Sequence, residues 1–194
     1  MKFLWLGGWA IPEWYILKHA QRVFPDDQHF FSPPVEDLRI QNDFDRVFGY
    51  SLGAFLLLRW PCRFPKKEPK TLISPFLAFP KENGLGGKIS RTQIKFTRRQ
   101  LKDNPLKTIN DFYLQAGINL ILDDLPYPLE GLMWGLNVLL SESVEPSKVL
   151  AEGTSAILGE KDNLLDVVRI AEFFPSHSIL KDAGHGLDQL LVNP

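Results

Sequence analysis

The 194-residue chain is 44% hydrophobic and 23% charged, and this length and composition fit one globular domain. Its formal net charge is −1, so no overall field attracts nucleic acid or an anionic membrane. Cys62 is the single cysteine, which excludes an internal disulfide, and no paired cysteines or close histidine cluster points to structural zinc. No apolar run reaches the length of about 18 residues that a membrane span requires. We therefore predict a cytoplasmic protein that holds no metal and binds neither nucleic acid nor membrane.

Short apolar runs alternate with helical patterns along the chain. Residues 2–6 indicate a buried strand rather than a signal peptide, because glycines interrupt the apolar run and no cleavage site of small residues follows. Helical spacing then covers residues 14–24, and a proline ends a nearly all-apolar helix over residues 52–60. Such alternation is typical of an α/β protein with a mainly parallel sheet covered on both faces. The strands we expect are 2–6, 29–31, 44–48, 70–74, 154–158 and 176–181.

The segment at about 80–145 differs from the rest of the chain. It begins with many charged residues, and its apolar residues then recur with the period of a helix. Two apolar faces recur at helical spacing, one through Ile109, Phe112, Tyr113 and Ala116, the other through Leu129, Leu132, Met133, Leu136, Leu139 and Leu140. The loop at 81–88 lacks the spacing of a phosphate-binding loop and an apolar strand before it, so we expect a flexible approach to the insertion. We predict two or three helices that form a lid, inserted into a single domain over residues 1–194.

Ser51 is the candidate for chemistry, in the pattern Gly49-x-Ser51-x-Gly53 directly after the expected strand at 44–48. Glycines on both sides let a strand turn sharply into a helix and expose the serine hydroxyl. A serine hydroxyl is a poor nucleophile at neutral pH, so it needs a base to remove its proton and a third group to hold that base. Because the short pattern also arises by chance in Ser-Gly loops, the interpretation depends on those partners.

His185 is the candidate base among four histidines. His19 falls inside the first helix, His29 beside a strand and His177 at the start of the last strand. A structural role explains a histidine at each of these positions. His185 instead follows the last strand between two glycines, which free the backbone to direct the ring toward the sheet edge. Its place after Ser51 fits the chain order serine, acid, histidine of one known triad scaffold.

Asp162 is the acid that we favour, because it lies in a loop just after an apolar strand, at the sheet edge where ligands bind in open parallel sheets. Other carboxylates remain open, since each is equally explained as a loop charge or a helix cap. These rivals are Glu160, Asp166, Asp123 and Asp124.

An acyl-transfer site also requires two fixed backbone N–H donors for the oxyanion of its tetrahedral intermediate. One candidate is the N–H of Leu52, next to Ser51. The other is the N–H of Trp9, which follows a glycine pair after the first strand, and its indole is a candidate pocket wall. An ordinary tight turn with a core tryptophan is the alternative for residues 7–9.

Four motifs occur in the order Gly7-Gly8-Trp9, Gly49-Tyr50-Ser51-Leu52-Gly53, Leu158-Gly159-Glu160-Lys161-Asp162 and Ala183-Gly184-His185. With these motifs the chain resembles the α/β-hydrolase superfamily over nearly its whole length. Three further stretches, Gly8 to Ala10, Tyr50 to Gly53 and Leu136 to Glu145, resemble the pimeloyl-[acyl-carrier protein] methyl ester esterases of biotin synthesis. Many relatives have histidine in place of Gly7. The chain starts at what is usually the third strand, so the resemblance implies a trimmed sheet of about six strands. It stops at Pro194, a few residues after His185, so the resemblance implies a short or missing closing helix.

The resemblance implies these site residues: the nucleophile Ser51, its partners Asp162 and His185, and the oxyanion donors Trp9 and Leu52. We also expect that Trp9 and Tyr50 contact the substrate and that the reaction needs no cofactor. The implied substrate is the methyl ester of a pimeloyl chain on acyl-carrier protein, cleaved to leave a free carboxylate. A thioesterase, a broad short-chain carboxylesterase and a non-catalytic binding protein on the same scaffold are the alternatives.

Basic residues recur at spacings of three to four in the insertion and share much of one helix face: Arg91, Lys95, Arg98, Arg99 and Lys102. Ile94 and Leu101, seven positions apart, are expected to face inward. Acyl-carrier proteins are acidic and carry a phosphopantetheine phosphate, so this face is a candidate docking surface for the carrier. A solvated helix face without function is the alternative.

Overall fold

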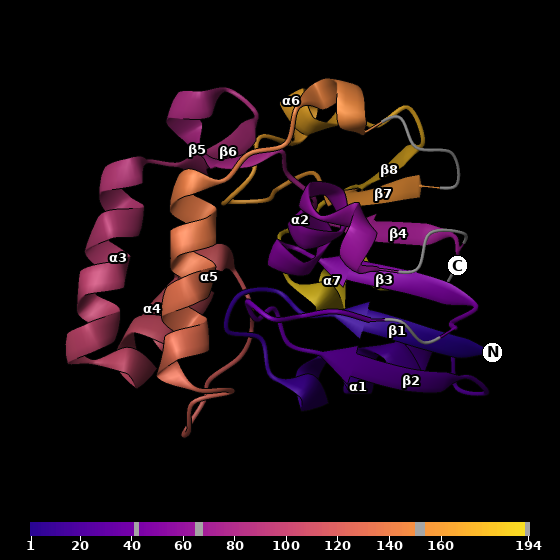
Figure 1. The fold of residues 1–194 in the computed structure, drawn as a ribbon, viewed down its shortest axis with the longest axis horizontal. Coiled ribbons are helices and arrows are strands. Elements are labelled where there is room, and N and C mark those ends of the chain that lie inside the picture. Colours follow the sequence, from indigo (N-terminus) through magenta and orange to yellow (C-terminus); the bar gives the residue numbers. More distant parts are fainter. Residues whose placement is uncertain (41–42, 65–67, 150–153, 193–194) are drawn as a thin grey trace.

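The computed structural model describes residues 1–40, 43–64, 68–149 and 154–192. Its centre is a six-stranded sheet in the order β2-β1-β3-β4-β7-β8, and every neighbouring pair is parallel (Figure 1). The strands are β1 (Lys2–Leu6), β2 (Gln28–Ser32), β3 (Arg46–Tyr50), β4 (Lys70–Ile73), β7 (Thr154–Gly159) and β8 (His177–Leu180). The predicted fold class and strand number are confirmed.

The third strand lies two residues beyond its predicted range of 44–48, because the glycine of the serine motif still belongs to the sheet. Gly49 is paired with Leu72, and Tyr50 with Ile73. The strand therefore ends immediately before Ser51, and the serine motif begins inside the sheet rather than after it.

Helices cover the sheet on both faces, as the burial of its central strands requires. The last four residues of β1 and of β3 are all buried, although neighbouring residues point to opposite faces. Helix α1 (Glu13–Val23) contacts β2 and α7 (Leu187–Leu190), and α2 (Leu52–Arg59) contacts β3. Helix α6 (Val167–Ala171) instead contacts the short strand β6 (Gly86–Ile89), which lies outside the main sheet.

Three helices lie beyond the carboxyl ends of the sheet strands (Figure 1). They are α3 (Arg91–Asp103), α4 (Pro105–Ala116) and α5 (Leu129–Ser141), and residues 91–141 are called the helical layer below. Helix α3 contacts both α4 and α5. Ile94 and Leu101 are buried as expected, at 2% and 0% exposure. The description of the chain as one domain with a lid insertion stays a prediction.

The loop at 81–88, predicted as a flexible approach without a strand before it, has regular structure instead. A two-stranded sheet forms from β5 (Ala78–Pro80) and β6 (Gly86–Ile89), with the 3₁₀ helix η2 (Lys81–Asn83) between them. The sequence pattern missed both strands because β5 has three residues and β6 begins with two glycines, which gives no alternation to detect. The other 3₁₀ helices of the described residues are η1 (Pro61–Arg63) and η3 (Pro146–Lys148).

Within the described part of the chain, no helix combines the length and the apolar character needed to cross a membrane.

Candidate active site

The predicted site residues follow the carboxyl ends of different strands. Trp9 comes after β1, Ser51 after β3, Asp162 after β7 and His185 after β8. Because the strands are parallel, these ends meet at one edge of the sheet, where open α/β sheets bind ligands. The helical layer lies off the same edge (Figure 1).

Ser51 occupies a strained turn between β3 and α2. Its backbone has φ 52° and ψ −111°, a conformation that residues other than glycine rarely adopt. Glycine is required two positions later, because a Cβ added at Gly53 would lie 2.3 Å from the carbonyl oxygen of Leu6. The packing of α2 against the end of β1 thus holds the turn, and it leaves the serine 8% exposed.

A hydrogen-bonded series joins Ser51, His185 and Asp162. His185 Nε2 lies 3.0 Å from Ser51 Oγ, and His185 Nδ1 lies 2.7 Å from Asp162 Oδ2. Since a carboxylate only accepts hydrogen bonds, Nδ1 carries the proton and Nε2 keeps a lone pair for the serine hydroxyl. His185 and Asp162 are buried, at 1% and 2% exposure, which shields the series from water.

Asp162 is itself fixed by its neighbours. Its Oδ1 accepts the N–H groups of Leu164 and Leu165, at 2.8 and 3.1 Å, while Ser74 Oγ donates to Oδ2 at 3.4 Å. Lys88 Nζ donates to the Asp162 carbonyl oxygen at 2.7 Å. Ser74 and Lys88 are not among the site residues predicted from the sequence. Ser74 had a detectable signal, because it directly follows β4 at the same sheet edge, whereas nothing near Lys88 indicates this contact.

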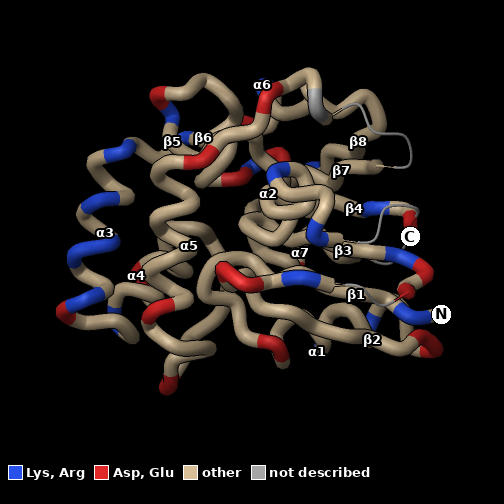
Figure 2. Tube along the Cα trace, in the orientation of Figure 1, with Lys and Arg blue, Asp and Glu red and all other residues tan. Residues whose placement is uncertain are grey.

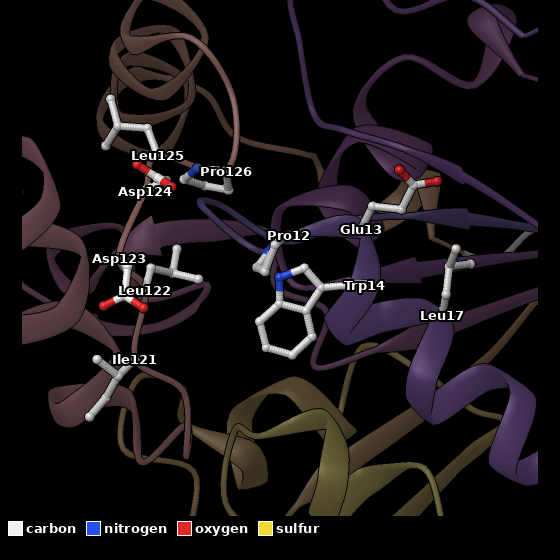
Figure 3. A pocket seen from close by; sticks show the side chains of 10 residues that line it. All are labelled: Pro12, Glu13, Trp14, Leu17, Ile121, Leu122, Asp123, Asp124, Leu125 and Pro126. Carbon is white, nitrogen blue, oxygen red and sulfur yellow. The ribbon is translucent and has the colours of Figure 1, made fainter.

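The four rival carboxylates have other surroundings. Glu160 accepts the N–H of Asp182, and Asp166 caps α6 by accepting the N–H of Arg169. Asp123 and Asp124 line a pocket of about 600 Å³ against Trp14, at the start of α1 (Figure 3). Of the five carboxylates considered, Asp162 is the one that contacts His185.

The turn after β1 brings Gly8, the residue before Trp9, close to the serine. A Cβ added at Gly8 would lie 3.3 Å from Ser51 Cβ. Within the described residues, the N–H groups of Trp9 and Leu52 donate no hydrogen bond to the protein, and Leu52 opens α2, whose first N–H groups have no partner inside the helix. The roles of these two N–H groups as oxyanion donors stay predictions.

Two side chains predicted to contact substrate are engaged within the protein. Trp9 is 2% exposed, and its Nε1 donates to the Leu132 carbonyl oxygen of α5 at 2.8 Å. Tyr50 is 1% exposed and donates to the His185 carbonyl oxygen at 2.8 Å. Burial raises the pKa of the Tyr50 phenol well above its usual value, so this hydroxyl keeps its proton. Tyr50 supports the His185 backbone, and its burial argues against the predicted substrate contact.

Basic residues recur along α3 (Figure 2), where Lys95, Arg99 and Lys102 are exposed and Arg91 and Arg98 are half-buried. Lys95, Arg98, Arg99 and Lys102 line a hollow of about 300 Å³. Arg98 also donates to Asn137 Oδ1 of α5, at 3.1 Å. Arg91 does not line this hollow, and its guanidinium donates to the Leu140 carbonyl oxygen and to Asn83 Oδ1, both at 2.8 Å. It therefore ties α3 to its neighbours, and its predicted role in docking is not supported by this geometry.

No group of three or more His, Cys, Asp or Glu side chains in the described part of the chain is arranged to hold a metal ion.

Comparisons with proteins of known structure identify the fold of this chain. No protein-family model matches the chain, and no curated protein matches it in sequence. An esterase from Exiguobacterium antarcticum aligns with a TM-score of 0.68 and 12% identity, over 95% of this chain and 85% of the esterase. A hydrolase from Oleispira antarctica aligns with a TM-score of 0.58 and 13% identity, over 94% of this chain and 82% of the hydrolase. A methylesterase from Arabidopsis aligns with a TM-score of 0.50 and 14% identity, over 99% of this chain and 93% of the methylesterase.

At identities of 12 to 14%, the similarity to these three proteins is a similarity of fold alone. The chain has the α/β-hydrolase fold, with a sheet of six strands.

Proposed function

We propose that the protein is a serine carboxylesterase. The observation that carries this proposal is the buried series from Ser51 Oγ through His185 to Asp162, with distances of 3.0 and 2.7 Å. A serine in a strained turn, hydrogen-bonded to a histidine whose other nitrogen is held by a carboxylate, is the arrangement that activates a hydroxyl for attack on an acyl group.

In the acylation step, Ser51 Oγ attacks the ester carbonyl carbon while His185 Nε2 removes its proton. The carbonyl oxygen becomes an oxyanion, and the N–H groups of Leu52 and Trp9 donate to it. The C–O bond to the alcohol then breaks, and His185 returns the proton to the leaving oxygen. Asp162 keeps the imidazole oriented and stabilises its positive charge while the proton is held.

In the deacylation step, water takes the place of the alcohol. His185 removes a proton from that water, whose oxygen attacks the acyl-enzyme carbonyl carbon. The bond to Ser51 Oγ breaks, the serine regains a proton from His185, and the acid leaves. Each cycle converts one ester and one water into one acid and one alcohol, and it uses no cofactor.

As the substrate, we propose the methyl ester of a pimeloyl chain on acyl-carrier protein. The support from the structure is the outward face of α3, where Lys95, Arg98, Arg99 and Lys102 gather in a protein of net charge −1. An acidic carrier with a phosphate-bearing arm complements such a face. A thioesterase, a broad short-chain carboxylesterase and an inert binding protein give different outcomes in the test below.

The test combines activity with product identity. Wild type and Ser51→Ala are incubated with p-nitrophenyl esters, with methyl pimeloyl-carrier protein and with a pimeloyl thioester, and products are read by mass. We expect loss of the methyl group from the carrier-linked ester and no turnover by Ser51→Ala. Cleavage of only the thioester indicates a thioesterase, cleavage of only small esters a broad esterase, and no turnover of any substrate an inert binder.

A further inference from the structure

The turn after β1 has an unusual residue at its third position. Ile11 N–H donates to the Gly8 carbonyl oxygen at 3.3 Å, which closes a turn over residues 8–11. Ala10 has φ 60°, a left-handed conformation that glycine adopts easily and alanine does not. Ala10 is also completely buried. Surrounding contacts must therefore hold this conformation, and the turn carries the N–H of Trp9.

The contacts that hold the turn come from the helical layer. Tyr113, on α4, donates its hydroxyl to the Ala10 carbonyl oxygen. The N–H of Ala10 donates to the hydroxyl oxygen of Tyr127, in the connection between α4 and α5, at 2.6 Å. The two tyrosines thus fix the peptide groups on both sides of Ala10. Because each peptide group is planar, this sets the backbone torsions of Ala10.

Both phenols are suited to this task. Burial raises the pKa of Tyr113 and of Tyr127 well above the usual value, so both hydroxyls keep their protons at physiological pH. Tyr113 can therefore act as a donor toward Ala10 throughout this range. Its side chain has no exposed surface, so water does not compete for the bond.

Helix α5 holds the residue that precedes Ala10. The Trp9 indole donates to the Leu132 carbonyl oxygen, and its ring meets Phe112 edge to face at 4.9 Å. A Cβ added at Gly135 would lie 2.6 Å from Trp9 Cδ1 and 3.3 Å from Leu52 Cδ2. Helix α5 therefore packs against both residues whose N–H groups are the proposed oxyanion donors.

A pocket lies between the start of α1 and the connection that joins α4 to α5. Pro12 and Trp14 form one side of the pocket of about 600 Å³, and Leu122 and Pro126 form the other (Figure 3). Directly after Pro126, Tyr127 bridges to Ala10. Tyr127 thus links the connection between α4 and α5 to the turn next to this pocket.

We infer that Tyr113 and Tyr127 are positioning residues, which hold the Ala10 turn so that the Trp9 N–H points at the oxyanion. This inference rests on the proposed function. It means that docking of the helical layer and assembly of the oxyanion site are one event. If the layer moves away, Ala10 loses both partners and its left-handed conformation loses its support.

The test uses variants that remove only hydroxyl groups. Tyr113→Phe, Tyr127→Phe and the double variant keep the rings, and kcat and KM are measured with a small p-nitrophenyl ester. We expect the double variant to lower kcat about tenfold or more, because loss of one oxyanion donor costs on the order of 10²–10³. KM is expected to stay within about twofold, because the donor acts on charge that develops in the transition state. A double variant within about twofold of wild-type kcat overturns the inference.

A matched control and a rescue separate positioning from general stability. Thr108→Val removes another buried hydroxyl of α4, which donates to the Asn104 carbonyl oxygen at 2.7 Å, and it should leave kcat unchanged. Ala10→Gly in the double-variant background should restore part of kcat, because glycine adopts the turn without support. An equal loss in Thr108→Val, or no recovery with Ala10→Gly, overturns the inference.

A measurement that does not depend on catalysis distinguishes failure of this inference from failure of the proposed function. Amide hydrogen exchange of Ala10, followed by NMR, should be slow in wild type and about tenfold or more faster in Tyr127→Phe, since the accepting oxygen is gone. Absence of turnover and of Ser51 labelling by a fluorophosphonate contradicts the proposed function alone. Unchanged exchange at Ala10 contradicts the inference, whether or not the protein is an esterase.

Discussion

The carboxyl edge of the sheet and the helical layer are built differently. Every residue other than glycine with positive φ in the described chain follows a strand of the main sheet: Ala10, Ser51, Ser74 and Asp182. The helical layer, residues 91–141, has positive φ only at Gly117, which ends α4. The edge also buries Asp162 and His185, whereas α3 keeps Lys95 and Lys102 exposed.

Under the proposed function, this difference corresponds to a division of tasks. Strained backbone and buried polar groups persist only where surrounding structure fixes them, and they are typical of sites that need exact geometry. Exposed charge on a regular helix suits contact with a partner, since it acts over distance and tolerates movement. The two regions meet at the Ala10 turn. Substitutions at the edge should therefore change catalysis itself, and substitutions on α3 should change the encounter with a charged substrate.

After the loss of turnover expected for Ser51→Ala, the largest effect is expected at the edge, from Asp162→Asn. The amide can donate toward His185 Nδ1 and so favours the tautomer that lacks a lone pair at Nε2. By analogy with serine proteases, kcat should fall on the order of 10⁴. Steady-state kinetics with a p-nitrophenyl ester measures this fall.

Two matched substitutions show whether the effect belongs to the edge. Asp166→Asn keeps a residue that caps helices well, and Asp123→Asn changes a pocket residue, so both should be mild. A severe loss in either, with Asp162→Asn mild, contradicts the assignment of the acid.

On the helical layer, the double charge reversal Arg98→Glu with Arg99→Glu should act on the carrier-linked substrate alone. We expect kcat/KM for methyl pimeloyl-carrier protein to fall about tenfold through KM, because steering by opposite charge is replaced by repulsion. Small p-nitrophenyl esters should be turned over within about twofold of wild type. Added salt should slow only the carrier-linked reaction of wild type, because it screens exposed charges.

Lys18→Glu, an exposed reversal on α1, serves as the control for net charge. Equal losses toward both substrates indicate damage to the layer. No loss toward either leaves the basic face of α3 as solvated surface.

Ser74→Ala tests the comparison between the sheet edge and the helical layer with a smaller expected effect on kcat. The Ser74 hydroxyl reaches Asp162 Oδ2 at 3.4 Å, a long hydrogen bond beside the stronger one from His185. Its loss should lower kcat about threefold and leave KM unchanged. The matched variant in the layer is Ser141→Ala, whose hydroxyl donates to the Asn137 carbonyl oxygen at 2.7 Å, and it should leave kcat unchanged. Equal effects of the two variants contradict the division of tasks.

The sequence predicted the sheet well, because short apolar runs between turn residues locate strands without knowledge of their partners. It also placed Ser51, Asp162 and His185 at one edge, since each follows a strand and parallel strands end together. Contacts across long sequence separations were out of reach. Tyr113 and Ala10 are 103 positions apart, and Tyr127 and Ala10 are 117 apart, so their hydrogen bonds depend on how the helical layer docks. Periodicity marks Tyr113 as an inward residue but does not name its partner.

The smallest expected effect is on stability at acidic pH. None of the four histidines lies in residues 91–141, so we expect this effect from the sheet and the helices that cover it. His19 is buried in α1 beside Tyr15, and within the described residues its Nδ1 has no hydrogen-bond partner. Burial lowers the pKa of this imidazole, Arg22 and Lys18 add to that effect, and Asp188 opposes it.

The unfolded chain therefore binds a proton near pH 6.5 that the folded chain still excludes, so the free energy of unfolding falls as pH drops below that value. His19→Leu removes this proton uptake. Thermal unfolding at pH 7 and pH 5.5 should show a Tm decrease that is smaller by about 2 °C in His19→Leu than in wild type. His177→Gln, at an exposed position of β8, should retain the wild-type decrease. An unchanged decrease in His19→Leu means that other groups, outside α1, carry the acid sensitivity.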